Sequence, residues 1–270
     1  MAGLTASDVE ITEVNGVTLA YREIGSGHPL LLINGFASPM DTWNPPVLSL
    51  LAQTFRVIVF DNRGTGYSSA SDKPFSIPLF AADTAALMDM LRITRAHILG
   101  LSMGASIAQE LVLAHPVRVE KLVLVAGTCG GPQMIRMQKE TWDRLADKSG
   151  GQAELADRMF SVLFPEDWLV SHDPGKYCPV VHETTSEENA ARQAEAFFGW
   201  TGSWERLPKI RNPTLAVTGT EDVVIPSENA AILADRIQDA RLIRFAGAGH
   251  GLQYQCPQEF SRTVLEFLKD

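Results

Sequence analysis

The sequence predicts an α/β fold in which helices cover both faces of a mostly parallel sheet. Two observations lead to this prediction. Short apolar runs recur along the chain without the strict alternation that marks a strand with one exposed face, and such continuous runs are typical of strands buried on both faces. Segments with apolar residues at helical spacing lie between these runs, and alternating strands and helices are the pattern of an α/β protein.

The elements can be assigned in order along the chain. Two alternating, β-branched runs flank Asn15-Gly16 in VEITEVNGVTLAYREIG, which favours a hairpin with a tight turn. Buried strands are predicted at 29–34, 55–61, 96–102 and 121–127, and the strand pattern resumes at 213–219 and 240–247. Helices are predicted at 80–94, 104–116 and 257–269.

The alternation stops between residues 129 and 207, where no clear strand pattern occurs. Helices are predicted there at 132–147 and 186–200. Thr185 and Glu188 have the spacing of a capping box for the second of these helices. We therefore expect an α/β core made of residues 1–128 and 208–270, interrupted by a helical cap, or lid, at 129–207.

Composition excludes several classes of function. The chain has 270 residues, of which 45% are hydrophobic and 20% charged, as in ordinary globular proteins. A net charge of −9 without a Lys/Arg run argues against nucleic acid or an anionic membrane as a partner. No run approaches the roughly 18 apolar residues of a membrane helix. The sequence leaves the oligomeric state open.

The N-terminal stretch and the cysteines predict a cytoplasmic location. MAGLTASDVEITEVNG has neither the basic segment nor the apolar segment of a secretory signal. The three cysteines, Cys129, Cys178 and Cys256, are an odd number without paired spacing. Reduced thiols in the cytoplasm are the simplest interpretation.

A nucleophile motif, G-x-S-x-G, occurs in GLSMG from Gly100 to Gly104. It follows a predicted buried strand and opens a predicted helix, which is the context of a nucleophile elbow. Such a turn holds the serine in a strained backbone conformation that exposes its Oγ, and it needs small residues where strand and helix approach closely. Ser102 is therefore the candidate nucleophile; the alternative is a glycine-rich turn with an incidental serine.

A serine nucleophile needs a general base, and six histidines are available: His28, His97, His115, His172, His182 and His250. The first two stand at the start of predicted strands, the third ends a helix, and the next two fall in the insertion. His250, in GAGHG, alone lies just past the C-terminal end of a predicted strand, where open α/β sheets place their sites. His250 is therefore the candidate base.

The base needs a carboxylate that fixes its tautomer. Asp222 and Glu221 both follow the strand PTLAVTG, and we favour Asp222, which gives G-x-x-D-x-x-x-P from Gly219 to Pro226. The segment after the preceding strand, TCGG, offers no carboxylate. Asp61, in DNRGTGYS, precedes the serine, contrary to the Ser…Asp…His order of this motif class, and we assign it to a supporting turn.

Five motifs in this order, INGF, DNRGTGYS, GLSMG, GTEDVVIP and GAGHG, resemble those of the α/β-hydrolase superfamily over essentially the whole chain. The resemblance implies an eight-stranded, mostly parallel sheet with a helical cap inserted after the sixth strand. The chain looks most like small cytosolic enzymes of the 3-oxoadipate enol-lactonase and carboxylesterase kind. Epoxide hydrolases and haloalkane dehalogenases of this superfamily carry Asp as nucleophile, so Ser102 argues against both.

The expected reaction is acyl transfer to water through an acyl-enzyme on Ser102. The backbone N–H of Met103, directly after the nucleophile, is one expected donor to the oxyanion. The resemblance implies Phe36 as the second, because it follows the position of the family's His-Gly pair. This chain has Asn34 in place of that histidine, and we expect Asn34 to hold the loop by hydrogen bonds without transferring protons.

A small-molecule ester or lactone is the expected substrate, with no metal and no cofactor, because no cluster of His, Cys and Asp has metal-ligand spacing. Large apolar residues of the insertion are expected to supply both packing and pocket lining: Met134, Met137, Trp142, Met159, Phe160, Phe164, Trp168, Phe197, Phe198, Trp200 and Trp204. Arg136, Lys139 and Arg192 could face a carboxylated substrate or simply solvent. Alternatives are a C–C-bond hydrolase, a cofactor-free perhydrolase, or a small-ligand receptor on the same fold.

Overall fold

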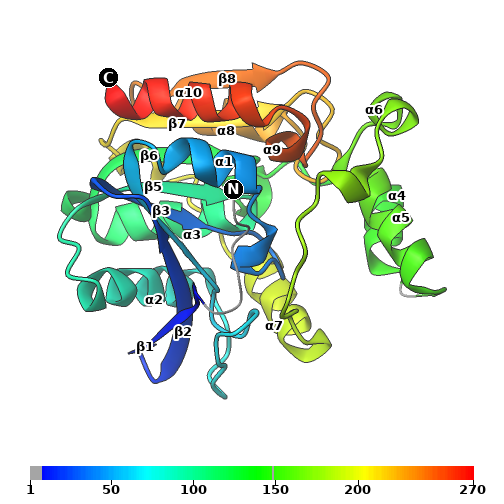
Figure 1. Cartoon of the computed structure of the whole chain (residues 1–270). Helices are drawn as coiled ribbons and strands as arrows, with labels where there is room; N and C mark the ends of the chain where they lie inside the picture. The colour runs from blue at the N-terminus through cyan, green and yellow to red at the C-terminus, as the bar shows by residue number, and fades with distance from the viewer. Residues whose placement is uncertain (1–7, 148) are drawn as a thin grey trace.

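The computed structural model describes residues 8–147 and 149–270, so the first part of the stretch used to exclude a secretory signal lies outside the described residues. Within them, eight strands form one sheet in the order β1-β2-β4-β3-β5-β6-β7-β8 (Figure 1). β2 is antiparallel to β1 and β4, and all other pairs are parallel. This confirms the predicted eight-stranded, mostly parallel sheet. The strands are β1 Glu10–Val14, β2 Val17–Ile24, β3 His28–Ile33, β4 Phe55–Phe60, β5 Ala96–Leu101, β6 Val119–Val125, β7 Thr214–Gly219 and β8 Arg241–Phe245.

Helices connect these strands and cover both faces of the sheet (Figure 1). They are α1 Pro45–Leu51, α2 Ile77–Met90, α3 Met103–Ala114, α4 Lys139–Ala146, α5 Gln152–Leu163, α6 Glu166–Ser171, α7 Glu187–Phe198, α8 Glu228–Arg236, α9 Leu252–Gln255 and α10 Pro257–Lys269. No helix of the described residues is both long enough and apolar enough to cross a membrane.

Alternate residues of each central strand face two separate cores. Leu31 and Ile33 of β3 belong to the core under α2 and α3. Leu30 and Leu32 belong to the opposite core, with α1 and α10. Because both faces of the strand are buried, β3 reads as a continuous apolar run, which explains why the central strands could be recognised from the sequence.

The first two strands form the predicted hairpin, with Val14 paired to Val17 across the turn. Asn15 and Gly16 both have positive φ, 46° and 77°. Two consecutive residues of this kind make a type I′ turn, whose twist matches that of the strands.

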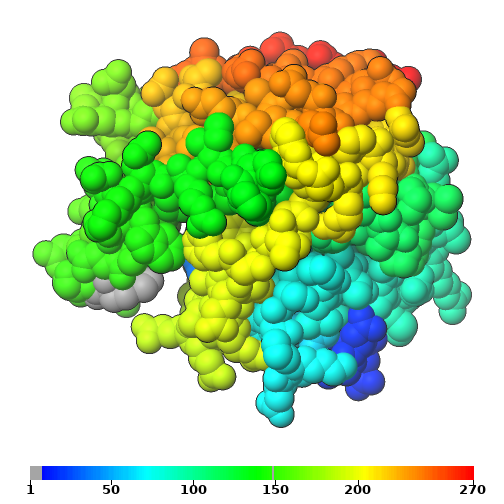
Figure 2. All heavy atoms as spheres, turned by 180° about the vertical axis from the view of Figure 1, so that it is seen from behind, coloured from blue at the N-terminus to red at the C-terminus, as the bar shows by residue number. Residues whose placement is uncertain are grey.

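The segment between β6 and β7 holds four α-helices, α4 to α7, and no strand among its described residues. Figure 1 shows α4, α5 and α6 standing to one side of the sheet, and Figure 2 shows the same segment projecting from the body in the opposite view. The predicted helix at 132–147 is wrong in its first half, because α4 begins only at Lys139. The backbone of Ile135 instead exchanges two hydrogen bonds with the Asn229 side chain, which holds this stretch extended.

The predicted capping box of α7 is also wrong. Ser186, not Thr185, is the N-cap residue, and its Oγ accepts the N–H of Asn189 at 3.2 Å. The hydroxyl of Thr185 donates instead to the carbonyl of Ala37, in the loop after β3, at 3.1 Å. A tertiary contact between the insertion and the core therefore takes the side chain that the local pattern assigned to the helix.

Candidate active site

Ser102 forms by itself the turn between β5 and α3. Its backbone has φ 57° and ψ −120°, in the region that residues other than glycine rarely adopt. Its N–H donates to the carbonyl of Val125, at the end of the neighbouring strand β6, over 2.8 Å. The turn is thus strained and held in place from outside, as expected at a functional site.

Two glycines around Ser102 allow the close approach that this turn requires. A Cβ at Gly100 would collide with the backbone of Gly104, and a Cβ at Gly104 would collide with the carbonyl oxygen of Ile33. The loop after β3 also lies directly on the serine. A Cβ built on Gly35 would be 3.1 Å from Cβ and 3.6 Å from Oγ of Ser102. The structure therefore brings the INGF loop and the GLSMG turn together.

His250 and Asp222 are joined by a hydrogen bond of 2.8 Å between Nδ1 and Oδ2. Asp222 follows β7 and His250 follows β8, so both stand at the edge of the sheet where Ser102 follows β5. The Asp222 side chain is fully buried, whereas the His250 side chain remains 12% exposed. Glu221 is exposed. The histidine that the sequence singles out is thus paired with the carboxylate that it favours.

Asp222 is held rigidly for this contact. Its Oδ1 accepts the backbone N–H groups of Val224 and Ile225 at 2.9 and 2.8 Å. The other oxygen is thereby aimed at His250, and its carboxylate charge favours a proton on Nδ1, which leaves Nε2 as the acceptor. Among the described residues, no hydrogen bond links Nε2 to Oγ of Ser102. Catalytic hydrogen bonds often tighten only when substrate is bound.

The other five histidines lie away from this pair. His28 begins β3 and His97 is near the start of β5, at the opposite edge of the sheet. Burial lowers the pKa of His97 to about 4. His115 follows the end of α3, and the remaining two are in the insertion. His182 there contacts Asp41, which itself forms a buried ion pair with Arg22.

Asn34 ties down the loop after β3. It is 1% exposed, and its Nδ2 donates to the carbonyl of Pro39 at 2.8 Å and to Oγ1 of Thr42 at 2.7 Å. Its Oδ1 accepts the N–H of Gly35 at 2.9 Å. All the hydrogen-bonding groups of the side chain are thus used inside the loop, in agreement with the structural role expected for Asn34.

The candidate oxyanion donors are backbone amides at this loop and at the elbow. Met103 is the first residue of α3, so its N–H has no partner within the helix. Phe36 follows Gly35, and among the described residues its N–H makes no hydrogen bond. Two amides without partners beside the serine are what an oxyanion hole requires before substrate binds.

Three residues of the insertion contact the loop after β3: Thr185 and Gln193 bind Ala37, and His182 binds Asp41. Gln193, on α7, is fully buried; its Oε1 accepts the N–H of Ala37 at 2.8 Å and its Nε2 donates to Oγ1 of Thr65 at 2.7 Å. Ala37 has a positive φ of 51°, directly after Phe36. Together with Thr185, Gln193 therefore fixes the segment that carries the Phe36 amide. The sequence contains no local signal for it, since a glutamine in an amphipathic helix is ordinarily exposed.

The insertion also contacts the loop that carries His250. The carbonyl of Leu163, at the end of α5, accepts the N–H of Gly251 at 2.8 Å. A Cβ on Gly251 would collide with the ring of Phe164, which is itself 2% exposed. The histidine loop is thus packed against the insertion on one side and bonded to Asp222 on the other.

The remaining residues proposed for the pocket divide into packed and exposed groups. Trp200 is buried, and its indole N–H donates to Glu110 at 2.7 Å. Trp142, Met159 and Phe198 are 40–44% exposed. Arg192 lies over the ring of Phe75, 3.8 Å from its centroid, and donates to two backbone carbonyls of the 71–73 loop. Lys139 pairs with Asp143 on the surface of α4. Arg192 and Lys139 are therefore already engaged by protein groups.

Asp61 is a buried residue in the loop after β4 that supports the candidate site. It is fully buried, and its two oxygens accept the N–H groups of Met40 at 2.6 Å and Tyr67 at 2.9 Å. Burial raises the pKa of Asp61 to about 6, against the opposing effect of these two hydrogen bonds. Asp61 thus links the segment after β3 to the segment after β4, as expected for a supporting turn.

A strained serine after a buried parallel strand, with a histidine–carboxylate pair at the same sheet edge, defines the class of hydrolases built on this fold. Residues 30–263 match the alpha/beta hydrolase family, and the chain belongs to that family. Membership implies a hydrolytic enzyme with a small-molecule substrate.

Several known proteins are similar along nearly their whole length. The chain is 31% identical to "Putative carbamate hydrolase RutD" from Azorhizobium caulinodans, over 92% of this chain and 94% of that protein. It is 30% identical to "Putative non-heme bromoperoxidase BpoC" from Mycobacterium tuberculosis, over 93% and 97%. The solved structure of the enol-lactonase from Burkholderia xenovorans LB400 superposes with a TM-score of 0.82 at 28% identity, over 97% of this chain and all of that chain.

Proposed function

We propose that Ser102, His250 and Asp222 form the catalytic triad of a serine hydrolase that cleaves a small carboxylic ester or lactone. The observation that carries this proposal is the 2.8 Å hydrogen bond between His250 and a rigidly held Asp222, at the sheet edge where Ser102 occupies a strained turn. The three residues follow three different strands of one sheet and stand at its carboxyl edge, where α/β sheets place their sites.

The mechanism follows from the orientation of the groups. With Nδ1 of His250 engaged by Asp222, Nε2 takes the proton of Ser102 as Oγ attacks the carbonyl carbon. The tetrahedral intermediate collapses as the C–O bond to the alcohol oxygen breaks, and that oxygen receives the proton from His250. An ester then releases its alcohol, a lactone keeps the hydroxyl on its opened acyl chain, and in both cases an acyl-enzyme remains. Water activated by His250 then releases the acid. Because the imidazole must be neutral to accept a proton, acid should reduce the rate.

The Phe36 and Met103 amides act in this proposal as the two oxyanion donors. Their unpartnered N–H groups support this role, since donors that are already in place cost no reorganisation during the reaction. Removing one such donor from a hydrolase typically costs about 2.7–4 kcal/mol of transition-state stabilisation. The binding of Gln193 and Thr185 to Ala37 explains how this short loop stays in position.

Residues 129–207 act as a cap in the same proposal. They contact the loop of Ala37 and the loop of Gly251. Because these loops carry the candidate oxyanion donor and the base, the contacts support the proposal that this segment covers the site.

We also place the enzyme in the cytoplasm, because its three cysteines are all unpaired and free thiols are typical of a reducing compartment.

The relatives support the substrate class and also name one competing reaction. The names enol-lactonase and carbamate hydrolase both refer to carboxyl derivatives that can transfer their acyl group to a serine. The similarity to a non-heme bromoperoxidase favours cofactor-free perhydrolysis as the second candidate, in which hydrogen peroxide replaces water as the acceptor of the acyl group. Both reactions pass through the same acyl-enzyme and therefore share one test.

The test is turnover of p-nitrophenyl acetate and butyrate, combined with covalent labelling by a fluorophosphonate. The wild type should show both, and Ser102→Ala should show neither. A wild type that is folded but shows neither turnover nor label would overturn the proposal and favour a ligand receptor. Label retained in Ser102→Ala would show that another residue is the nucleophile. A panel of lactones, esters and carbamates, with and without hydrogen peroxide, then separates the reactions.

The neighbouring carboxylates provide a matched pair of variants. Asp222→Asn should keep the geometry but favour the wrong tautomer of His250, which costs about 10⁴-fold in kcat in a comparable triad. Glu221→Gln, one residue away and exposed, should leave kcat within about twofold. A larger loss in Glu221→Gln than in Asp222→Asn would mean that the wrong carboxylate has been assigned.

A further inference from the structure

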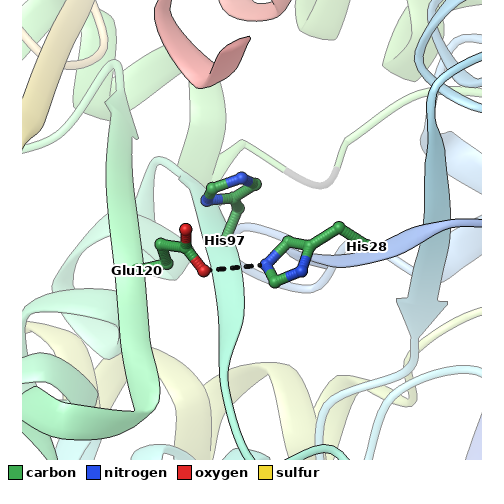
Figure 3. Close-up of side chains that lie close together, drawn as sticks. All are labelled: His28, His97 and Glu120. Atoms are coloured by element: carbon green, nitrogen blue, oxygen red, sulfur yellow. Dashed lines mark ion pairs between the residues drawn. The ribbon is translucent and has the colours of Figure 1, made fainter. Parts of the chain in front are cut away.

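Two histidines and a glutamate converge at the edge of the sheet opposite the proposed active site. His28 begins β3, His97 is the second residue of β5, and Glu120 is the second residue of β6. These strands are adjacent and parallel in the order β3-β5-β6, so their first residues lie side by side. Figure 3 shows the three side chains pointing toward one another above the sheet.

The distances between the three side chains are those of a loosely formed metal site. One ligand atom from each residue lies within 4.8 Å of the other two. Nε2 of His28 and Oε2 of Glu120 are already 3.1 Å apart. Two ligands on a tetrahedral zinc ion at 2.0–2.1 Å are separated by about 3.3 Å. The separations from His97 are at most 4.8 Å, so they need to shorten by no more than about 1.5 Å to reach this spacing. Rotation of the His28 and Glu120 side chains, which are 40% and 34% exposed, toward the buried His97 can supply that movement.

His97 gives a second, independent indication. The residue is 4% exposed, and its Nδ1 is buried without a hydrogen-bond partner among the described residues. Buried polar atoms are nearly always satisfied, so an isolated one needs an explanation. Figure 3 shows a ring nitrogen of His97 on the side facing the Glu120 carboxylate. His97 is fixed by edge contacts to the rings of His28 and Phe55 at 4.7 and 5.4 Å, which aim it at the cluster.

We propose that His28, His97 and Glu120 form a binding site for a divalent transition-metal ion of the zinc type. Two imidazoles and one carboxylate are a ligand set that zinc uses with a water molecule in the fourth position. Magnesium and calcium, which prefer all-oxygen surroundings, do not match this set. This site goes beyond the proposed function and does not depend on it.

The neighbouring cations do not block the site. Arg95 reaches Glu120 only at 3.9 Å, and its side chain is 56% exposed, so it can turn into solvent. Lys121 is bound to the carbonyl of Phe267 at 2.9 Å. His97 and Ser102 are five residues apart on one extended segment, about 17 Å. A metal at this site therefore fastens three strand ends together and takes no part in the reaction at Ser102.

The test is zinc binding to the whole chain, measured by calorimetry and by the change in melting temperature. The absorption spectrum with cobalt(II) in place of zinc then reports whether histidines are ligands. We expect one equivalent to bind and the melting temperature to rise by about 5 °C when free zinc exceeds Kd a hundredfold. His28→Ala and Glu120→Gln, both on partly exposed side chains, should remove the shift. His97→Phe should do the same while filling the space of the imidazole.

His115→Ala is the matched control, because His115 lies outside the cluster, and it should bind zinc like the wild type. The proposal is overturned if the wild type binds no zinc at millimolar concentration. It is equally overturned if His28→Ala and Glu120→Gln bind zinc as tightly as the wild type, since the metal would then be held by other histidines or by cysteines. If His97→Phe does not fold, the other two variants decide the outcome.

Discussion

At the scale of single residues, Asn34 shows how the loop after β3 is held by a side chain that differs from the one the resemblance implies. The resemblance implies a histidine at this position, and this chain has an asparagine that makes three hydrogen bonds inside the loop. The proposed oxyanion donor is the backbone of Phe36, so it does not require a particular side chain two residues earlier. Through its three hydrogen bonds the asparagine ties Gly35, Pro39 and Thr42 together.

Asn34→Ala should therefore lower the free energy of unfolding by about 2–3 kcal/mol, because a net hydrogen bond contributes roughly 0.5–1.5 kcal/mol and three are lost. Urea unfolding measures this loss. Activity should fall less than in Ser102→Ala, with an unchanged pH profile. Asn34→Asp is the informative companion, since it keeps the acceptor for Gly35 but loses both donors. A stable Asn34→Ala that is as inactive as Ser102→Ala would contradict the structural role.

The residues proposed for catalysis could be predicted from the sequence because each belongs to a short pattern beside a strand end. Ser102, Asp222 and His250 each follow a predicted strand, and the carboxyl ends of these parallel strands share one edge of the sheet. Gln193 could not be predicted, because its partners Ala37 and Thr65 are more than 100 residues away in the chain. The cluster of His28, His97 and Glu120 likewise has no spacing signal, since each residue comes from a different strand.

At the scale of elements, the side chain of Gln193 joins α7 to the loop after β3 through a hydrogen bond to Ala37. Gln193→Ala should remove both of its hydrogen bonds and release Ala37, the residue after the proposed oxyanion donor. Because a displacement of about 1 Å can cost up to about 100-fold in rate, we expect kcat to fall by about 10- to 100-fold with KM changed less than threefold. Steady-state kinetics on a p-nitrophenyl ester measures the two constants separately.

Gln152→Ala is the control for this prediction, because Gln152 is an exposed glutamine at the start of α5 in the same insertion. It should leave both constants unchanged. If Gln193→Ala raises KM and leaves kcat intact, then α7 contributes to substrate binding and does not position the oxyanion loop.

Elements of the core and elements of the insertion differed in how well the sequence predicted them. Central strands are buried on both faces, so their apolar runs are continuous and their ends fall within one or two residues of the predicted limits. The stretch 134–138 carries a helical pattern but lies outside any helix, and the backbone of Ile135 within it is bound by the Asn229 side chain. Insertion helices rest on tertiary contacts of this kind, which local patterns do not contain.

At the scale of the whole molecule, the proposed active site and the proposed metal site lie at opposite edges of the mostly parallel sheet. All three proposed catalytic residues follow the carboxyl ends of strands, and the proposed metal ligands stand at the amino ends of three strands.

Asp61 lies at the carboxyl edge of the sheet, after β4, but we expect it to affect the stability of the whole fold, because it joins two loops through buried hydrogen bonds. Its ionisation therefore couples the stability of the protein to pH.

The sign of this coupling follows from proton binding. The pKa of Asp61 is raised to about 6 in the folded chain, against about 3.9 for an unperturbed aspartate. Between these values the folded state binds more protons than the unfolded state, so the contribution of Asp61 to stability falls as pH rises from about 4 to about 6. It is constant outside that window. At about 1.4 kcal/mol per pKa unit, the change between pH 4.5 and pH 7.5 is about 2 kcal/mol.

Comparing the stability of Asp61→Asn with that of the wild type isolates this contribution, because an asparagine does not ionise. It should be less stable than the wild type at pH 4.5, because its amide cannot accept both N–H groups, and the deficit should shrink by about 2 kcal/mol at pH 7.5. Urea unfolding at the two pH values measures the change. Asp235→Asn, on the exposed side of α8, should show the same difference from wild type at both. A deficit that grows with pH would mean that the hydrogen bonds from Met40 and Tyr67 outweigh burial and that Asp61 is more acidic in the fold than in the unfolded chain.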